Sequence, residues 1–163
     1  MCGIVGVVGG DPAENAVARD ALVHRGPDAA GAWSEGAVLL GHRRLSIIDL
    51  SVAGSQPMIS ACGRWVIVYN GEVYNHEELR ARVPAGRFSG TSDTEALLAC
   101  IASNGLAASL PWLNGIFAFA AYDRERHELH LVRDRMGVKP LYVASNGRRL
   151  AFARWLTGGK NPL

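Results

Sequence analysis

The sequence is poor in cysteine and has no long apolar run, and each shortage excludes a class of protein. Only three of its 163 residues are cysteines, an odd number without paired spacing, which argues against a disulfide framework and against a zinc site. The longest apolar run, Ile116–Tyr122, is far shorter than the roughly 20 residues that a membrane helix needs. The apolar stretch at the N-terminus lacks a charged leader and runs into Gly9-Gly10-Asp11, so no signal peptide is expected. We therefore expect a cytoplasmic protein that does not contact a membrane.

The sequence also lacks an excess of charge of one sign. Its formal net charge is +2, and acidic and basic residues alternate along the chain. A protein that binds a phosphate backbone requires a basic face, so nucleic acid is not an expected partner. The length and the 48% apolar content fit one domain with a substantial core and leave no room for a second.

Short apolar runs separated by turn residues predict a structure made mainly of strands. The runs expected as strands are Ile4–Val8, Val38–Leu40, Leu45–Ile48, Trp65–Tyr69, Ile116–Tyr122, Leu129–Val132, Leu141–Ala144 and Leu150–Phe152. Helices are expected at Pro12–Val23, at His76–Val83 and from Ser92 to Asn104-Gly105, where Ser92 and Glu95 have the spacing of a capping box. Because the helices separate groups of strands and do not alternate with them, the pattern indicates an α+β layered domain.

The start of the chain, Met1-Cys2-Gly3, offers a nucleophile. Removal of Met1 would place the Cys2 thiol and a free α-amine on one residue. A thiol titrates near pH ~8.5 and a terminal amine near ~7.7–8.0, so at neutral pH the amine is partly unprotonated and can accept the thiol proton. Cys2 is thus a candidate for acyl transfer, although a cysteine can also follow a start methionine without any function.

Other residues could supply the remaining needs of amide hydrolysis. Asn70-Gly71 follows the apolar run Trp65–Tyr69, where a side-chain amide and a backbone N–H could meet a developing oxyanion, but the same pair is also common in tight turns. Three histidines, His24, His42 and His76, have spacings that match no metal pattern, so no metal site is expected.

Two charged residues have both a functional and a structural interpretation. Arg44 precedes an apolar run, where its guanidinium could point into a cleft or could be a solvated flanking charge. Asp93 lies in the first turn of the helix that Ser92 caps, where the helix dipole favours a carboxylate with or without a function. The sequence alone leaves both pairs of alternatives open.

Several segments, taken together and in order, resemble one known family. They are Met1–Ile4, His24–Asp28, Gly41–Asp49, Tyr69–Asn75, Ser92–Glu95, Leu113–Phe119 and Arg133–Tyr142. This series resembles the glutaminase domain of class II glutamine amidotransferases, and Pro27-Asp28 with Glu72–Asn75 resembles the asparagine synthetase branch. The resemblance covers residues 1–153, which we take as the glutaminase domain, and it leaves 154–163 as an irregular tail or truncation point.

The resemblance implies a fold and a reaction. The fold would be a four-layer αββα sandwich of the N-terminal-nucleophile hydrolase type. The reaction would be hydrolysis of L-glutamine to glutamate and ammonia through a thioester on Cys2. The Asn70 amide and the Gly71 N–H would form the oxyanion hole, and no cofactor would be needed for this half-reaction.

The resemblance also implies how the two ends of the substrate would be held. Arg44 would bind the α-carboxylate, with Ile47 and Ile48 lining the pocket. Asp93 would bind the α-ammonium, and Glu72 would assist it.

Members of the branch continue into a synthetase domain, and the chain lacks its Ser-Gly-Gly-x-Asp-Ser nucleotide loop. A separate or missing ATP-dependent synthetase domain is therefore the expected ammonia acceptor, and ATP and Mg would belong only to that domain. The alternative is a catalytically silent module that binds glutamine or docks on a synthetase. Blocked removal of Met1 would produce such a module.

Overall fold

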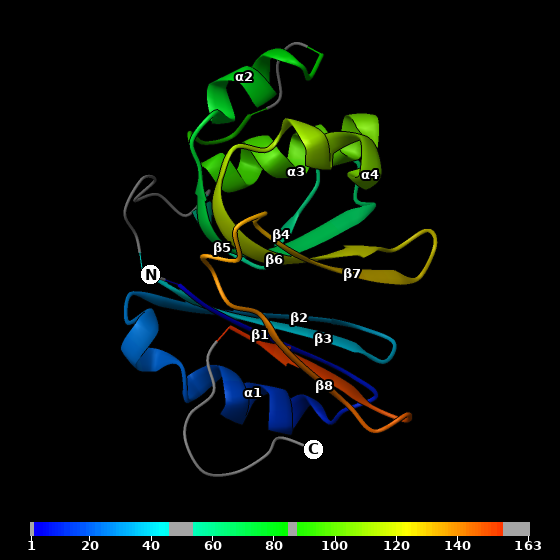
Figure 1. Cartoon of the computed structure of the whole chain (residues 1–163). Helices are drawn as coiled ribbons and strands as arrows, with labels where there is room; N and C mark the ends of the chain where they lie inside the picture. Colours follow the sequence, from blue (N-terminus) through cyan, green and yellow to red (C-terminus); the bar gives the residue numbers. More distant parts are fainter. Residues whose placement is uncertain (1, 46–53, 85–87, 155–163) are drawn as a thin grey trace.

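A computed structural model describes residues 2–45, 54–84 and 88–154, and it stacks two antiparallel sheets between two layers of helices (Figure 1). The first sheet has the order β2-β3-β1-β9-β8, with β1 (Gly3–Val8), β2 (Ala29–Glu35), β3 (Val38–Arg44), β8 (Tyr142–Ser145) and β9 (Leu150–Ala153). The second sheet has the order β4-β5-β6-β7, with β4 (Met58–Ile59), β5 (Trp65–Val73), β6 (Gly115–Asp123) and β7 (Glu128–Arg133).

The helices cover the outer faces of the two sheets. They are α1 (Pro12–Asp20), η1 (Val23–Arg25), α2 (His76–Ala81), α3 (Asp93–Asn104), α4 (Leu106–Ser109) and η3 (Leu110–Trp112). In Figure 1, α1 lies against the first sheet, and α2, α3 and α4 lie on the far side of the second. The predicted αββα layering is confirmed. None of the helices described is long and apolar enough to cross a membrane.

Most of the predicted elements form close to their expected bounds. α3 begins after Ser92, whose side chain accepts a hydrogen bond from Glu95 N, and it ends before Gly105 at φ +83°. The Glu95 carboxylate does not complete the capping box, because it accepts instead from Ser89 N and Gly90 N. Of the strand predicted at 45–48, Leu45 follows β3 without joining it, and 46–48 lie outside the described residues.

Five elements were not predicted: the strands β2 and β4 and the short helices η1, α4 and η3. β2 lies at the edge of its sheet, and its sequence is rich in alanine and glycine, which have low strand propensity. It forms because all seven of its residues, Ala29–Glu35, pair with β3. Tertiary pairing therefore overrides local propensity at this edge.

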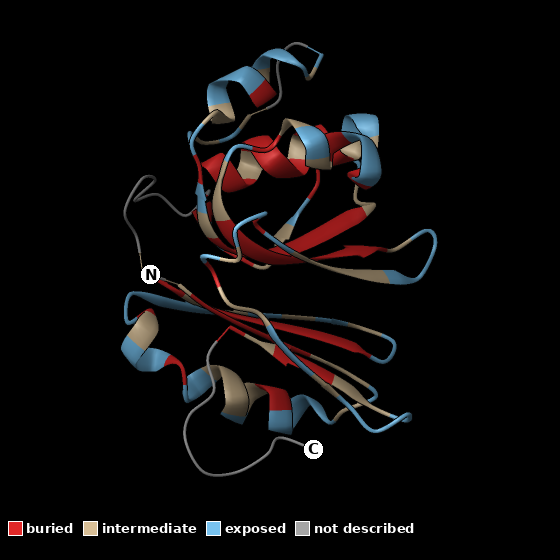
Figure 2. Cartoon of the chain, viewed as in Figure 1, coloured by how far each residue is buried: buried red, intermediate tan, exposed pale blue. Residues whose placement is uncertain are grey.

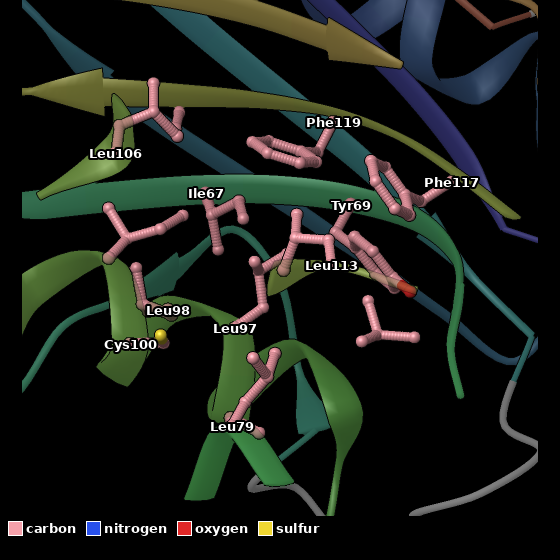
Figure 3. Packing of buried hydrophobic residues seen from close by; sticks show 14 of the residues in the cluster. Ile67, Tyr69, Leu79, Leu97, Leu98, Cys100, Leu106, Leu113, Phe117 and Phe119 are labelled. Carbon is pink, nitrogen blue, oxygen red and sulfur yellow. The ribbon is translucent and has the colours of Figure 1, made fainter. Parts of the chain in front are cut away.

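Two apolar layers occupy two of the three spaces between the four structural layers. The helix-facing layer, between the second sheet and α3, contains Trp65, Ile67, Tyr69, Val73, Leu79, Ala96, Leu97, Leu98, Cys100, Ile101, Leu106, Leu113, Phe117, Phe119 and Ala121 (Figure 3). The inter-sheet layer contains Ile4, Val38, Leu40, Val66, Val68, Ala118, Ala120, Tyr122 and Phe152. Figure 2 shows that buried residues run through both sheets and along α3.

Alternation along each strand decides which layer a side chain enters, because successive side chains of a strand point to opposite faces. On β5, Ile67 enters the helix-facing layer, while Val66 and Val68 enter the inter-sheet layer. Asn70 continues the second series. The same strands therefore supply both the apolar residues of the inter-sheet layer and the polar residues at its end.

Candidate active site

Cys2 directly precedes β1, which lies between β3 and β9 in the first sheet. Its Sγ accepts a hydrogen bond from Leu45 N at 3.4 Å and donates to Leu45 O at 3.6 Å. Leu45 directly follows β3, and the pairing of Gly3 with Arg43 brings the two segments side by side. The thiol is thus held in a partly buried place at the end of two paired strands.

The surroundings of Cys2 act on its pKa in opposite directions. Burial raises the pKa of the thiol above its ordinary value, and this is the largest effect. The Leu45 backbone hydrogen bond and the positive charges of Arg44 and Arg154 lower that pKa but do not outweigh burial. The thiol is therefore protonated at neutral pH, and a reaction at Sγ requires a base.

Asn70 lies within β5, opposite Ala118 of β6, so the turn interpretation of Asn70-Gly71 is wrong. Its side chain is 2% exposed, and Oδ1 accepts a hydrogen bond from Arg154 Nη1 at 3.3 Å. Nδ2 is buried and has no hydrogen-bond partner among the residues that the structure describes. A buried donor without a partner is costly, so this one is suited to a substrate oxygen.

At Gly71, next to Asn70, the backbones of β5 and β6 lie close together. A Cβ placed on Gly71 would overlap the Ile116 carbonyl oxygen and the Phe117 backbone, and the φ of +156° is one that other residues rarely adopt. Any side chain at this position would push the two strands apart. Glycine therefore keeps the backbone beside Asn70 in register.

Arg44 is the last residue of β3 and is 8% exposed, so the interpretation as a solvated flanking charge is wrong. It lies close enough to Cys2 to lower the pKa of the thiol. A guanidinium presents a planar fork of donors that matches a carboxylate. Its binding of the substrate carboxylate stays a prediction.

His42 lies two residues before Arg44 and is 1% exposed between the sheets. Burial lowers the pKa of its imidazole to about 4, and the charge of Arg44 lowers it further, while a hydrogen bond to the Tyr69 backbone opposes the shift. The ring is therefore neutral at physiological pH. Among the described residues, no three His, Cys, Asp or Glu side chains are grouped as a metal site would require.

Asp93, the first residue of α3, is 5% exposed and ties the helix to β5. Oδ2 accepts from Tyr69 Oη at 2.7 Å and from Val73 N at 2.9 Å, and Oδ1 accepts from Thr94 N at 2.8 Å. A carboxylate has about four acceptor sites, so these three bonds leave room for one more donor. Its position in the first helical turn is therefore only part of its explanation.

Tyr69 connects Asp93 with the surroundings of Cys2, and sequence reasoning missed it. Burial and then the negative charge of Asp93 raise the pKa of its hydroxyl, and Cys2 also contributes to this rise. The phenol therefore stays protonated and donates to Asp93. The sequence placed Tyr69 in an apolar run and at the start of the family segment Tyr69–Asn75, but it indicated no role for the hydroxyl.

The other predicted substrate residues are less well defined. Glu72 is exposed on β5, two residues beyond Asn70 and on the same face of the strand. Its charge raises the pKa of Tyr69 and opposes the burial that lowers the pKa of Lys139, so it lies near both residues. Ile47 and Ile48 lie outside the described residues.

Arg154 is the other residue that sequence reasoning missed. It is 6% exposed, and its Nη1 donates to Cys2 O at 3.1 Å as well as to Asn70 Oδ1. Residues 154–163 were expected to form an irregular tail. A usable signal existed, because Arg154 lies two residues after Phe152 and so on the same strand face as that inter-sheet residue.

A cavity of about 520 Å³ lies elsewhere, on the α3 side of the second sheet, and it is lined by residues that include Met58, Cys62 and Leu98. None of the site residues described above lines it. The polar constellation around Cys2 and this hollow are therefore separate features of the fold.

Comparison with known proteins gives one family. A family model described as "Glutamine amidotransferase domain" matches residues 1–157. The chain is 42% identical over 146 residues to asparagine synthetase [glutamine-hydrolyzing] 3 of Bacillus subtilis, covering 82% of this chain and 22% of that protein. It is 41% identical over 121 residues to asparagine synthetase B [glutamine-hydrolyzing] of Escherichia coli, covering 74% of this chain and 22% of that protein.

A solved structure supports the same fold. The glutamine phosphoribosylpyrophosphate amidotransferase of B. subtilis superposes with a TM-score of 0.81 at 22% identity, over 94% of this chain and 42% of that one. At this identity the likeness is evidence for the αββα fold alone. The chain spans about a fifth of the length of the curated relatives quoted above.

Proposed function

This chain belongs to the family of glutamine amidotransferase domains, and from that premise we propose that it hydrolyses the side-chain amide of L-glutamine to glutamate and ammonia. Cys2 is the nucleophile, and the Asn70 amide and the Gly71 N–H stabilise the oxyanion. The ammonia serves an amide-forming synthetase domain or subunit.

The reaction begins once Met1 has been removed. The free Cys2 amine takes the thiol proton, and the thiolate attacks the glutamine δ-carbon, whose oxygen becomes an oxyanion held by Asn70 and Gly71. When this intermediate collapses, the carbon–nitrogen bond breaks, and the amine returns the proton to the leaving nitrogen, which departs as ammonia. Water then cleaves the thioester and releases glutamate. The raised pKa of the thiol supports this route, because it makes an adjacent base necessary.

One observation carries the proposal: Asn70 is joined through its Oδ1 and Arg154 to the backbone of Cys2, while its buried Nδ2 has no hydrogen-bond partner among the described residues. A nucleophile and a donor for negative charge thus belong to one hydrogen-bonded unit. Amide hydrolysis through a thioester requires both. A module that only binds glutamine could use the amide donor, but it would not need a thiol at the same site.

The substrate's charged ends are assigned to residues around this unit. Arg44 binds the α-carboxylate, with Ile47 and Ile48 lining the pocket, and Asp93 binds the α-ammonium with Glu72 assisting. The burial of Arg44 and the remaining acceptor site on Asp93 support these roles. Opposite charges at two anchors favour a zwitterionic amino acid over a simple amide.

The partner is an ATP-dependent synthetase domain or subunit that uses ammonia, and ATP and Mg belong to it. The names of the matched asparagine synthetases support this proposal, because they describe glutamine-hydrolysing enzymes. Those proteins are also several times longer than this chain. We place the reaction in the cytoplasm.

The first experiment compares ammonia release from glutamine by the wild-type protein and by Cys2→Ala, after intact mass has established whether Met1 is absent. We expect Cys2→Ala to lower kcat on the order of 10⁴-fold or more, because loss of the nucleophile removes the thioester route. Cys62→Ala, which changes an exposed cysteine away from the site, is the matched control and should keep wild-type kcat. Equal ammonia release by wild type and Cys2→Ala would contradict the proposal. Glutamine binding without ammonia release would favour the silent module.

A further inference from the structure

Arg154 joins three segments that are far apart in the sequence. It directly follows β9, and its backbone N donates to Ile4 O at 3.1 Å, so it continues the pairing of β9 with β1. Its Nη1 donates to Cys2 O at 3.1 Å and to Asn70 Oδ1 at 3.3 Å. One guanidinium nitrogen therefore contacts both the nucleophile's backbone and the amide that faces it from the other sheet.

The hydrogen bond from Arg154 distinguishes the oxygen of the Asn70 amide from its nitrogen. An amide has an accepting oxygen and a donating nitrogen, whereas a guanidinium only donates. Rotation of the Asn70 amide by half a turn would place its NH₂ against the Arg154 donors and would lose this hydrogen bond. The arrangement with Oδ1 on Arg154 leaves Nδ2 pointing elsewhere, buried and without a partner among the described residues.

The charge of Arg154 also acts on the same unit. A cation bonded to Oδ1 withdraws electron density from the amide and makes Nδ2–H a better donor. The same charge lowers the pKa of the Cys2 thiol against the larger effect of burial. Arg25 and Lys139 lie close enough to interact electrostatically with Arg154, so the guanidinium is one of several cations around this end of the inter-sheet layer.

We propose that Arg154 is a positioning residue that fixes the Asn70 side-chain amide with its NH₂ toward the substrate oxygen and so completes the oxyanion hole from the end of β9. Its importance for kcat rests on the proposed function. Its control of the amide orientation does not, because that is a property of the protein without substrate.

The kinetic test is a double-mutant cycle between Arg154→Met and Asn70→Ala. Met has a long side chain without donors, so it removes the hydrogen bonds and keeps much of the volume. We expect Arg154→Met to lower kcat by about 10–100-fold and to change the KM for glutamine by less than about 3-fold, since the donor acts on the transition state. In the Asn70→Ala background the same change should cost less than about 3-fold, because the two residues act as one unit. Independent, multiplicative losses would overturn the proposal.

Two further variants separate positioning from folding. Arg154→Lys keeps a cationic donor and should give a kcat between those of wild type and Arg154→Met, and it replaces Arg154→Met in the cycle if the latter does not fold. Arg148→Met, which changes an exposed arginine just before β9, is the matched control and should leave kcat and KM unchanged. An Arg154→Lys enzyme less active than a folded Arg154→Met would count against the proposal.

The activity-free test follows the Asn70 side-chain amide by nuclear magnetic resonance. In the wild-type protein the Asn70 NH₂ signals should be sharp and should show contacts characteristic of one fixed orientation. Arg154→Met should shift and broaden them, while Arg148→Met should not. Unchanged Asn70 signals in Arg154→Met would overturn the inference. If wild type releases no ammonia, the proposed function fails, and this measurement still decides the role of Arg154.

Discussion

The two apolar layers on either side of β5 differ in what they contain and in how they end. The helix-facing layer holds large side chains such as Trp65, Leu97 and Phe119, and it is closed by helices (Figure 3). The inter-sheet layer also contains Tyr122 and Phe152, but β5 and β6 contribute mainly smaller residues to it, such as Val66, Ala118 and Ala120, and at one end it gives way to polar residues. Both layers draw on the same two strands, so alternation along a strand lets one face supply stability and the other supply chemistry.

The small residues of the inter-sheet layer have a direct effect on the site. Ala118 pairs with Asn70 across β5 and β6 and is fully buried. Because alanine ends at Cβ, the Asn70 amide is free to extend across the space between the sheets to Arg154. A larger residue at position 118 would compete with the amide for that space.

A change confined to the helix-facing layer is the strongest test of whether one layer supplies stability and the other supplies chemistry. Leu97 is fully buried there, so Leu97→Ala should lower the free energy of unfolding by about 2–5 kcal/mol through lost contacts and a cavity. The kcat for ammonia release, measured well below the unfolding midpoint, should stay within about twofold of wild type. Val17→Ala, at a 72% exposed position, should change the unfolding free energy by less than about 0.5 kcal/mol. A large fall in kcat for folded Leu97→Ala would show that the layers are not independent.

The opposite test removes a hydrogen-bond donor of the site from the inter-sheet layer and leaves the fold intact. Asn70→Asp keeps an oxygen for Arg154 but loses the NH₂ donor, so kcat should fall by about 10²–10³, equivalent to ~2.7–4 kcal/mol of transition-state stabilisation. Urea unfolding should show a smaller loss of stability than for Leu97→Ala, because the aspartate can pair with the guanidinium. A kcat within tenfold of wild type would exclude Asn70 as an oxyanion donor.

The pH dependence of stability offers a third comparison, because the inter-sheet layer contains the buried His42. Burial lowers its pKa to about 4 from the 6.5 of an exposed imidazole, so between these values the unfolded chain binds a proton that the folded protein does not. Above about pH 6.5, protonation of His42 therefore does not lower the free energy of unfolding. As the pH falls from there to about 4, this group lowers it by about 3 kcal/mol.

Urea unfolding of His42→Gln between pH 7 and pH 4 checks this expectation. Glutamine does not titrate, so the variant should lose less stability on acidification than wild type. His24→Gln, at an exposed position on η1, is the control and should follow the wild-type curve. Parallel curves for wild type and His42→Gln would show that His42 does not cause the acid sensitivity.

Much of the fold follows from local patterns, and what they miss has physical causes. Apolar runs located most strands, and Ser92 and Gly105 marked the ends of α3 because a cap and a left-handed stop are encoded locally. β2 was missed because its pairing partner, not its own composition, makes it a strand. The αββα layering came from the family resemblance, since local patterns indicated only an α+β domain.

The site was predicted unevenly for the same reason. The positions of Cys2, Asn70 and Arg44 came from motifs, and the structure adds their burial, the contact of Asn70 with Arg154 and the effect of Arg44 on the pKa of Cys2. Arg154 could not be found by motif, because its contact with Cys2 joins residues 152 positions apart and depends on the pairing of β9 with β1. The local signal that exists, its spacing of two residues from Phe152, indicates a strand face but neither of these contacts.

The central position of β1 has a consequence for the order of events during synthesis. The first strand lies between β3 and β9, and its final neighbour is made about 145 residues later. At roughly 5–20 residues per second, a ribosome needs about 10–30 s to supply that neighbour. Throughout this interval the emerging polypeptide carries the Cys2 thiol, while Arg154 has not yet been added. With the role proposed for Arg154, full activity can therefore arise only after β9 and the arginine that follows it have been translated.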